Sequence, residues 1–170
     1  MAKLPSMLVD INAFFKDESF AGLCNTVTLP KIVTKTVDQV LAGVAGDIER
    51  NIGKLEKLDC EVTIADYASK VIDLVGNRES RDDQFIVRGY VDTDAGDMAV
   101  AVKMQGFWKS MEHGGEFKPE EEAAMKFAIA VEVYTLEIDN KEIIHIDKMN
   151  NIFRVNGKDR NQKWREALAQ

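Results

Sequence analysis

The stretch KFAIAVEVYTLEIDNKEIIHID, residues 126–147, decides how this chain folds, because its composition is typical of two β-strands joined by a short polar turn. The first strand extends back to Ala124, so residues 124–138 form one extended segment. At about 3.4 Å per residue this strand would be roughly 50 Å long, whereas most strands contain only about 5–6 residues. A strand of that length crosses a whole domain.

The apolar side chains change sides within this strand. From Met125 to Val133 the large apolar residues occupy odd positions, whereas beyond Tyr134 they occupy even positions, Leu136 and Ile138. Because strand side chains alternate with a period of two, the change requires a β-bulge or a sharp twist, which we place near Tyr134. We therefore expect the strand to leave one sheet there and join another.

Two strands present faces that consist of alanine with a few charges. In residues 98–105 (MAVAVKMQ) and in residues 125–133, these faces contain Ala99, Ala101, Lys103, Lys126, Ala128, Ala130 and Glu132. A solvated outer sheet face has such a composition, and so does a smooth surface that lines a confined space. The sequence alone leaves both interpretations open.

The rest of the chain predicts one mainly β domain over residues 1–170, without internal repeats or linkers. We expect an N-terminal arm over about residues 1–13 and a helix over residues 67–75, capped by Asp66 and ended by Gly76. A second short helix is predicted from Asp159, as its cap, to Leu168. Residues 34–51 (TKTVDQVLAGVAGDIERN) have an irregular composition that fits neither a strand nor a helix well.

The composition excludes several classes of protein. A content of 45% hydrophobic and 30% charged residues over 170 residues is typical of a folded domain, and no apolar run approaches the ~20 residues of a membrane helix, so we expect no membrane anchor. The apolar start of the chain is interrupted by Pro5 and Asp10 and makes a poor secretory signal. Cys24 and Cys60 form no disulfide or metal pattern, which indicates synthesis in a reducing cytoplasm. The net charge of −7 argues against a protein that binds nucleic acid through its phosphates. It does not argue against a protein past which DNA moves without being bound.

No motif in the sequence supports catalysis, so we expect no catalytic residues, no metal site and no cofactor. Asp92 and Asp94 have the spacing of a calcium loop, but the glycine and glutamate that such a loop needs are absent, and an acidic hairpin turn is the better interpretation. His113 and His145 are 32 residues apart, which is no metal-ligand spacing. The chain also lacks a nucleophile elbow and a phosphate-binding glycine loop.

The order of the segments resembles the major tail tube proteins of contractile-tailed bacteriophages and of R-type bacteriocins. The similar stretches are FAGLCNTVTLPKIVTKT near the start, FIVRGYVDTDAGDMAVAVKMQGFWKSMEHGG in the centre, and AVEVYTLEIDNKEIIHIDKMNNIFRVNGKDR toward the end. The run at residues 27–31 and the stretch at residues 147–157 are the most specific parts. The resemblance covers roughly residues 14–168.

This resemblance implies a β-sandwich or half-barrel with one flanking α-helix, and hexameric rings that share one β-barrel around a channel. The rings would stack into the inner tube of a contractile tail, which houses the tape measure protein and conducts DNA, or acts as the puncturing tube, during ejection. Further implied partners are the sheath protein, the baseplate hub or tube initiator, and the tail terminator. The implied location is the virion tail, assembled in the cytoplasm of the host bacterium.

With this resemblance, the alanine faces become candidates for the channel lining, and Tyr134 becomes the passage of the long strand from the channel wall to the outer sheet. Residues 34–58 become the candidate stacking loop between rings. The candidates there are charged: Lys35, Asp38, Asp47, Glu49 and Arg50.

Two alternatives stay open. The first is the tube protein of a type VI secretion system or of another contractile injection system, which would share the ring fold. The second is a monomeric β-barrel that binds a small ligand, which would require an apolar interior and a single closed sheet.

Overall fold

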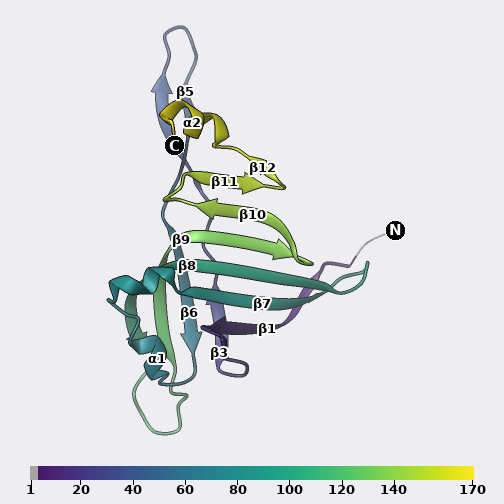
Figure 1. The fold of residues 1–170 in the computed structure, drawn as a ribbon, viewed down its shortest axis with the longest axis vertical. Coiled ribbons are helices and arrows are strands. Elements are labelled where there is room, and N and C mark those ends of the chain that lie inside the picture. Colours follow the sequence, from purple (N-terminus) through teal and green to yellow (C-terminus); the bar gives the residue numbers. More distant parts are fainter. Residues whose placement is uncertain (1–3) are drawn as a thin grey trace.

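The computed structural model describes residues 4–170 as an antiparallel β-structure with few helices, which confirms the mainly β prediction (Figure 1). The strands are β1 (Met7–Phe15), β2 (Glu18–Ser19), β3 (Cys24–Thr28), β4 (Thr34–Val40), β5 (Asp47–Leu55), β6 (Leu58–Ile64), β7 (Gln84–Asp92), β8 (Met98–His113), β9 (Met125–Ile138), β10 (Lys141–Asp147), β11 (Ile152–Val155) and β12 (Lys158–Asp159). The helical elements are α1 (Ser69–Ile72), the 3₁₀-helix η1 (Arg78–Asp82) and α2 (Gln162–Leu168).

One sheet of ten strands forms the body of the molecule. Its main path runs β12-β11-β10-β9-β8-β7-β1-β2, while β6 pairs with β9 and with β3. The first and last strands of this path are not paired with each other, so the sheet is open. Strands β4 and β5 form a separate two-stranded hairpin that projects from one end of the long axis, and the connection between β8 and β9 lies at the opposite end (Figure 1).

The long strand β9 changes partners along its length but stays within the one ten-stranded sheet, whereas the sequence analysis expected it to leave one sheet and join another. Its residues from Met125 to Val131 pair with β6, and those from Val133 to Ile138 pair with β10, while β8 pairs along its other edge throughout. Against β8 the register skips Glu132, because Val131 lies opposite Gly106 and Val133 lies opposite Gln105. The change of face therefore begins at Glu132, two residues before the Tyr134 position inferred from the sequence.

Gly106 permits the two long strands to approach each other at this point. A Cβ atom on Gly106 would overlap the carbonyl oxygen of Ala130 and would lie 2.9 Å from the Cα of Val131. These are backbone atoms at the bulge, so a side chain cannot be accommodated by a simple rotamer change. The sequence analysis had not identified this residue, although an isolated glycine inside a strand pattern is the known signal for such an approach.

The core is centred on an aromatic cluster. Trp108 of β8 makes edge-to-face contacts with Phe15, Phe85 and Phe127 at ring-centroid distances of 5.9, 5.8 and 5.8 Å. All four rings are at most 3% exposed, and they come from four different strands. Edge-to-face geometry adds about 0.5–1.5 kcal/mol per pair to the gain from burying the area. This cluster therefore packs β1, β7, β8 and β9 together in the core, near the point where β9 changes partners.

Both predicted helices are present but begin differently from the prediction. Helix α1 has only four residues, and its N-cap is Ala68 rather than Asp66. The chain then turns at Gly76, which has the predicted positive φ (78°), and its N–H donates to the carbonyl of Trp108. Helix α2 has Asn161 rather than Asp159 as its N-cap, because Asp159 belongs to β12.

Two other segments differ from the sequence analysis. Residues 34–51, predicted to be irregular, contain strand β4 and the first part of β5. Of the predicted arm over residues 1–13, the part from Met7 onward is strand β1, which pairs with β7. Residues 1–3 lie outside the described part of the chain.

Candidate assembly interfaces

The alanine faces lie on the side of the β8–β9 ribbon that points away from the core. In both strands the alternate residues are the buried ones, and the pairing places Ala130 opposite Phe107 and Lys103 opposite Thr135. This side of the ribbon includes six of the seven candidate channel residues: Ala99, Ala101, Lys103, Lys126, Ala128 and Ala130. Glu132 is the bulged residue and interrupts the row. The structure thus brings the two predicted faces together on one continuous surface.

The candidate charges on this surface are each paired within the chain. The ammonium of Lys103 lies 2.6 Å from a carboxylate oxygen of Glu137 on the neighbouring strand. Lys126 lies 3.0 Å from Glu61, and this hydrogen bond raises the pKa of Lys126 above its ordinary value. Glu132 lies 3.2 Å from Arg81 of η1. The surface therefore carries charged groups but little unpaired charge.

Much of the acidic excess lies instead in the connection between β8 and β9. Residues 114–124 contain four glutamates (116, 120, 121 and 122) and a single cation, Lys118. Lys118 pairs with both Glu116 and Glu121, at 2.9 and 2.8 Å. The end of the molecule opposite to the hairpin is therefore negatively charged.

The open sheet has an unprotected edge at β1. Strand β2 pairs only with Phe14 and Phe15, and the N–H of Phe20 donates to the carbonyl of Ala13, which leaves the outer edge of β1 without a backbone partner over residues 7–12 of the described chain. Three consecutive apolar residues on this edge, Met7, Leu8 and Val9, are 68%, 59% and 56% exposed. An exposed apolar edge is a template for pairing with another chain. At the other end of the sheet, β12 contributes only two residues.

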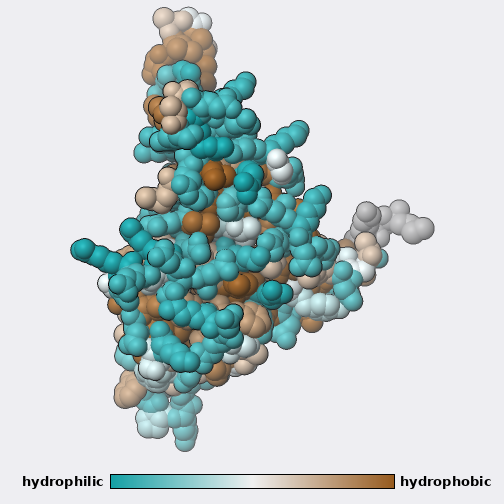
Figure 2. Space-filling view, in the orientation of Figure 1, coloured by the Kyte–Doolittle hydropathy of each residue, from teal (hydrophilic) through white to brown (hydrophobic). Residues whose placement is uncertain are grey.

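The β4–β5 hairpin exposes apolar side chains on a ribbon that has no core of its own. The hydrophobic patch at its end is visible in the space-filling view, where it projects beyond the hydrophilic body (Figure 2). The exposed apolar residues are Val37, Val40, Leu41, Val44, Ile48 and Ile52. A two-stranded hairpin alone is at best marginally stable in water, so this surface is suited to burial against another molecule.

The five charged stacking candidates all lie on this hairpin and are all exposed. Asp38 lies directly opposite Glu49, Asp47 lies opposite Val40, and Arg50 lies opposite Val37. Lys35 lies at the register shift near the base. Like charges directly across a ladder are destabilising, and no ion pair within the described residues compensates Asp38 or Glu49.

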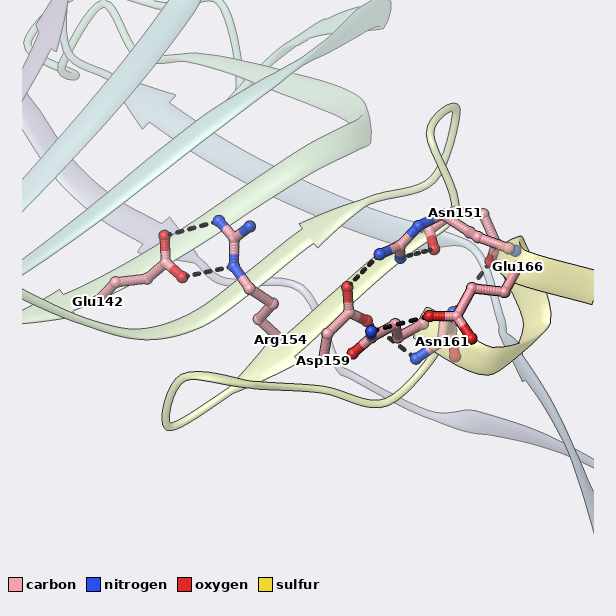
Figure 3. A network of polar contacts seen from close by, with 8 residues as sticks. Glu142, Asn151, Arg154, Asp159, Asn161 and Glu166 are labelled. Atoms are coloured by element: carbon pink, nitrogen blue, oxygen red, sulfur yellow. Dashed lines mark hydrogen bonds and ion pairs between the residues drawn. The ribbon is translucent and has the colours of Figure 1, made fainter. Parts of the chain in front are cut away.

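Helix α2 joins the base of this hairpin to the sheet, and the sequence analysis had not identified this joint. Arg165 donates to the carboxylate of Asp159 at 2.6 Å and to the carbonyl of Asn151 at 2.9 Å, and Asn161 donates to the side chain of Asn151 at 3.0 Å (Figure 3). The hydrogen bond from Arg165 holds the pKa of Asp159 below its ordinary value. Together these bonds fix α2 against β12 and the β10–β11 turn.

The other side of α2 faces the hairpin. Gly53 of β5 has a φ of +76°, and a Cβ atom there would lie 3.8 Å from the Trp164 ring. The ammonium of Lys54 lies 6.0 Å from the centre of the same ring. The bulge at Gly53 therefore gives the Trp164 ring room to pack against β5 at the base of the hairpin.

The described residues, 4–170, contain no group of three or more histidine, cysteine or acidic side chains that could hold a metal ion. No helix among them is long and apolar enough to cross a membrane. Cys24 and Cys60 are buried and not bonded to each other, and burial raises the pKa of Cys60 to about 12. A thiol with such a pKa is not a nucleophile at neutral pH.

An open sheet, an exposed apolar hairpin and paired surface charges are features of a structural protein with surfaces suited to burial against a partner. The model of the family "Phage tail tube protein FII" matches residues 5–168, and the chain belongs to this family of structural tail tube proteins. This confirms the resemblance seen in the sequence. The family is a class of virion tail components and not a class of enzymes.

A curated relative and two solved structures agree with this assignment. The tail tube protein of Escherichia phage P2 is 30% identical over 177 aligned positions, which cover 98% of each chain. In fold, the chain is similar to the sheath/tube terminator of the extracellular contractile injection system PVC, with a TM-score of 0.58 at 13% identity over 81% of this chain and 99% of the other. The tube-terminating cap of the anti-feeding prophage also gives a TM-score of 0.58, at 11% identity over 81% and 93% of the chains.

Proposed function

We propose that six copies of this chain close into a ring by pairing their open sheets edge to edge, and that the rings stack into the inner tube of a contractile phage tail. The observation that carries this proposal is the unpaired edge of β1 with its exposed run Met7, Leu8 and Val9. Pairing in a ring removes every exposed edge, as closure does in a β-barrel. The long strands β8 and β9 would then form part of the shared channel wall.

The hairpin provides the axial contact in this proposal. A filament requires a heterologous contact, in which one surface of a subunit binds a different surface of the next. The hairpin and the β8–β9 connection lie at opposite ends of the long axis, which suits such head-to-tail stacking (Figure 1). The candidates Lys35, Asp38, Asp47, Glu49 and Arg50 would lie between rings and would find their counter-charges on the neighbouring ring.

The paired charges explain how DNA would pass without specific binding. A phosphate that approached Lys103 or Lys126 would have to displace a carboxylate already within 2.6 or 3.0 Å of the ammonium. Six copies, each with a net charge of −7, would also give a ring a charge of −42, which opposes the adsorption of phosphates. The same channel would hold the tape measure protein before ejection.

The remaining partners follow from the position of such a tube in a tail. We infer a sheath protein around it, a baseplate hub or tube initiator at one end and a tail terminator at the other, with assembly in the host cytoplasm and with no catalytic activity of its own. The similarity to two tube-terminating proteins of injection systems favours an injection-system tube as the second candidate. Sheath, tape measure and capsid genes beside this gene would indicate a phage. The ligand-binding barrel requires a closed sheet, and the sheet here is open.

Negative-stain electron microscopy of the purified chain over a range of concentrations tests the proposal, with a baseplate hub added where nucleation is slow. We expect rings and hollow tubes. A variant that lacks residues 38–49, replaced by a short turn, should form rings but no tubes, because the ring contacts are on the sheet. Tubes of normal length from this variant would overturn the stacking role, and particles of single-subunit size under all conditions would overturn the ring.

A further inference from the structure

A groove of about 360 Å³ lies at the base of the hairpin, between β5, the β10–β11 turn and helix α2. Its lining includes Lys54, Lys148, Met149, Trp164 and Leu168. Met149 and Leu168 are 75% and 55% exposed, so apolar surface here remains in contact with water. Two lysines and one aspartate, Asp147, are the charged side chains of the lining, so these side chains carry one net positive charge; the ammonium of Lys148 already donates to the carbonyl of Glu56 at 2.8 Å, and Lys54 supplies the remaining cation.

The opposite end of the molecule carries a matching protrusion. Phe117, in the connection between β8 and β9, is 87% exposed, the highest value among the large hydrophobic side chains of residues 4–170. Its ring approaches only the edge of the body, with its centroid 6.1 Å from that of His113. The same connection holds four glutamates against one lysine, so the phenyl ring is presented on a negatively charged loop.

We propose that Phe117 of one copy inserts into the groove beside Trp164 of a copy in the adjacent ring. The charges of loop and groove are opposite, and the two surfaces lie at opposite ends of the long axis, so head-to-tail stacking brings them toward each other (Figure 1). The occupant of the groove is therefore a second copy of this chain. The inference rests on the proposed stacking of rings and names a second axial contact in addition to the hairpin.

Insertion would also link the two kinds of contact in a tube. Trp164 forms one wall of the groove and packs against the bulge at Gly53, and α2 is held on the sheet by Arg165. A neighbouring ring bound at the groove would therefore contact the region where α2 packs against the base of the hairpin, and this packing sets the direction of the hairpin. Each added ring would hold the hairpins of the ring below in position for stacking.

Cross-linking in assembled tubes tests the contact. A chain with both Phe117→Cys and Leu168→Cys, treated with a short bis-maleimide, should give a ladder of dimers, trimers and longer covalent chains in a denaturing gel. The two positions lie at opposite ends of one molecule, so a link within a single chain cannot produce the ladder (Figure 1). The native Cys24 and Cys60 are buried and should not react, and each single-cysteine variant should stop at dimers.

Two further pairs identify a different occupant. A ladder from Leu168→Cys with Val40→Cys, and none from the first pair, would mean that the hairpin end of another copy fills the groove, and it would overturn the proposal. A ladder from Phe117→Cys with Val40→Cys alone would place the loop against the hairpin end and would overturn it as well.

Assembly without cross-linking provides an independent test. Phe117→Ser should raise the concentration at which tubes form by roughly tenfold or more, because a buried phenyl ring is lost from every axial contact. Phe117→Leu keeps the apolar contact and should assemble much as the wild type does. Equal assembly of wild type and Phe117→Ser overturns this contact while the tube function stands. Failure of the wild type to assemble, even with the hub, would overturn the function and this contact with it.

Discussion

The body of the molecule and its hairpin follow opposite principles of stabilisation. In the body, Trp108, Phe85 and Phe127 are at most 2% exposed, and the charges on the alanine face are paired within the chain. In the hairpin, Val40 is 82% exposed and Asp38 lies opposite Glu49. The body therefore has a core of its own and leaves the edge of β1 and the β8–β9 connection for other copies, whereas the hairpin has no core of its own and exposes its apolar side chains to water.

Because of this difference, substitutions can affect the stability of the subunit and its assembly separately. A change in the buried core of the body should lower the stability of the subunit and affect assembly only through the fraction that is folded. A change in the hairpin should leave the subunit stable and affect assembly directly. The comparison fails if a hairpin substitution unfolds the subunit.

The largest effect is expected at the aromatic cluster. Trp108→Ala should lower the free energy of unfolding by about 3–5 kcal/mol, because it removes the ring that contacts three others. Val40→Ser, its counterpart on the hairpin, should change the free energy of unfolding by no more than about 0.5 kcal/mol but should prevent tubes from forming. Urea unfolding and electron microscopy of both variants measure the two properties. A loss of stability in Val40→Ser above about 2 kcal/mol would contradict the comparison.

The next effect concerns the close approach of β8 and β9. Gly106→Ala should lower the free energy of unfolding by about 2–3 kcal/mol, because the new methyl group meets backbone atoms of Ala130 and Val131 that cannot rotate away. Gly89→Ala is the matched control in the same sheet. There the nearest atom, 2.9 Å from the new Cβ, is the end of the exposed Leu8 side chain, which can move.

Thermal unfolding of the two glycine variants under the same conditions gives the comparison. Gly89→Ala should lie within about 1 kcal/mol of the wild type. If the two variants are equally stable, β8 and β9 can separate at the bulge, and the close approach at Gly106 does not constrain the body.

The same contrast explains what the sequence could predict. The long strand and its change of face follow from the alternation of side chains, which is a local property that is strong wherever a strand contributes to the core of its own chain. The sequence did not predict the hairpin because its side chains pack against no core: Val37 and Ile48 are 45% and 44% exposed, so no alternation between core and solvent is imposed on it. The contact of Gly53 with Trp164 joins distant parts of the chain and leaves no local pattern.

Details at helix ends were missed for a related reason. Asp66 and Asp159 both have the residue type of an N-cap, but tertiary contacts assign them other places. Asp159 pairs through its backbone with Arg154 and through its carboxylate with Arg165. The anchor of α2 was thus visible in the sequence as a cap and proved to be an ion pair.

The third prediction concerns the docking of helix α2, which connects the hairpin to the body. Because the folded-state pKa of Asp159 is lowered, its contribution to stability is complete above the ordinary pKa of about 3.9 and is lost as the pH falls through the lower folded-state value. Asp159→Asn should therefore weaken the docking of α2 by about 1–2 kcal/mol at neutral pH, and wild type and variant should converge only when the pH falls below the lowered folded-state pKa of Asp159. Hydrogen exchange of the α2 amides measures the docking.

Glu142→Gln is the matched control for that experiment. Glu142 pairs with Arg154 in the same network but does not contact α2 (Figure 3). It should leave the exchange of α2 unchanged. Equal loosening in both variants would mean that the network acts as a whole and that Arg165 is not the specific anchor of the joint.

The smallest effect on stability, below about 1 kcal/mol, is expected from Glu137→Gln, which leaves the ammonium of Lys103 without its carboxylate 2.6 Å away. Tubes of this variant should retain DNA at low salt and release it as the salt concentration rises, since each freed lysine can bind a phosphate and displace its counterions. Removing both charges, with Lys103→Gln added, should abolish the retention.

Asp38→Asn removes a carboxylate from the hairpin and completes the comparison. Like Glu137→Gln it makes the subunit less acidic by one charge, but Asp38 is paired with no cation of its own chain within residues 4–170 and does not lie on the alanine face. If net charge alone kept DNA from the wall, the two variants would retain DNA equally. If only the Glu137→Gln tubes retain DNA, the wild-type wall does not bind DNA because its cations are already paired with carboxylates. The paired charges of the body would then have a function that the charges of the hairpin do not share.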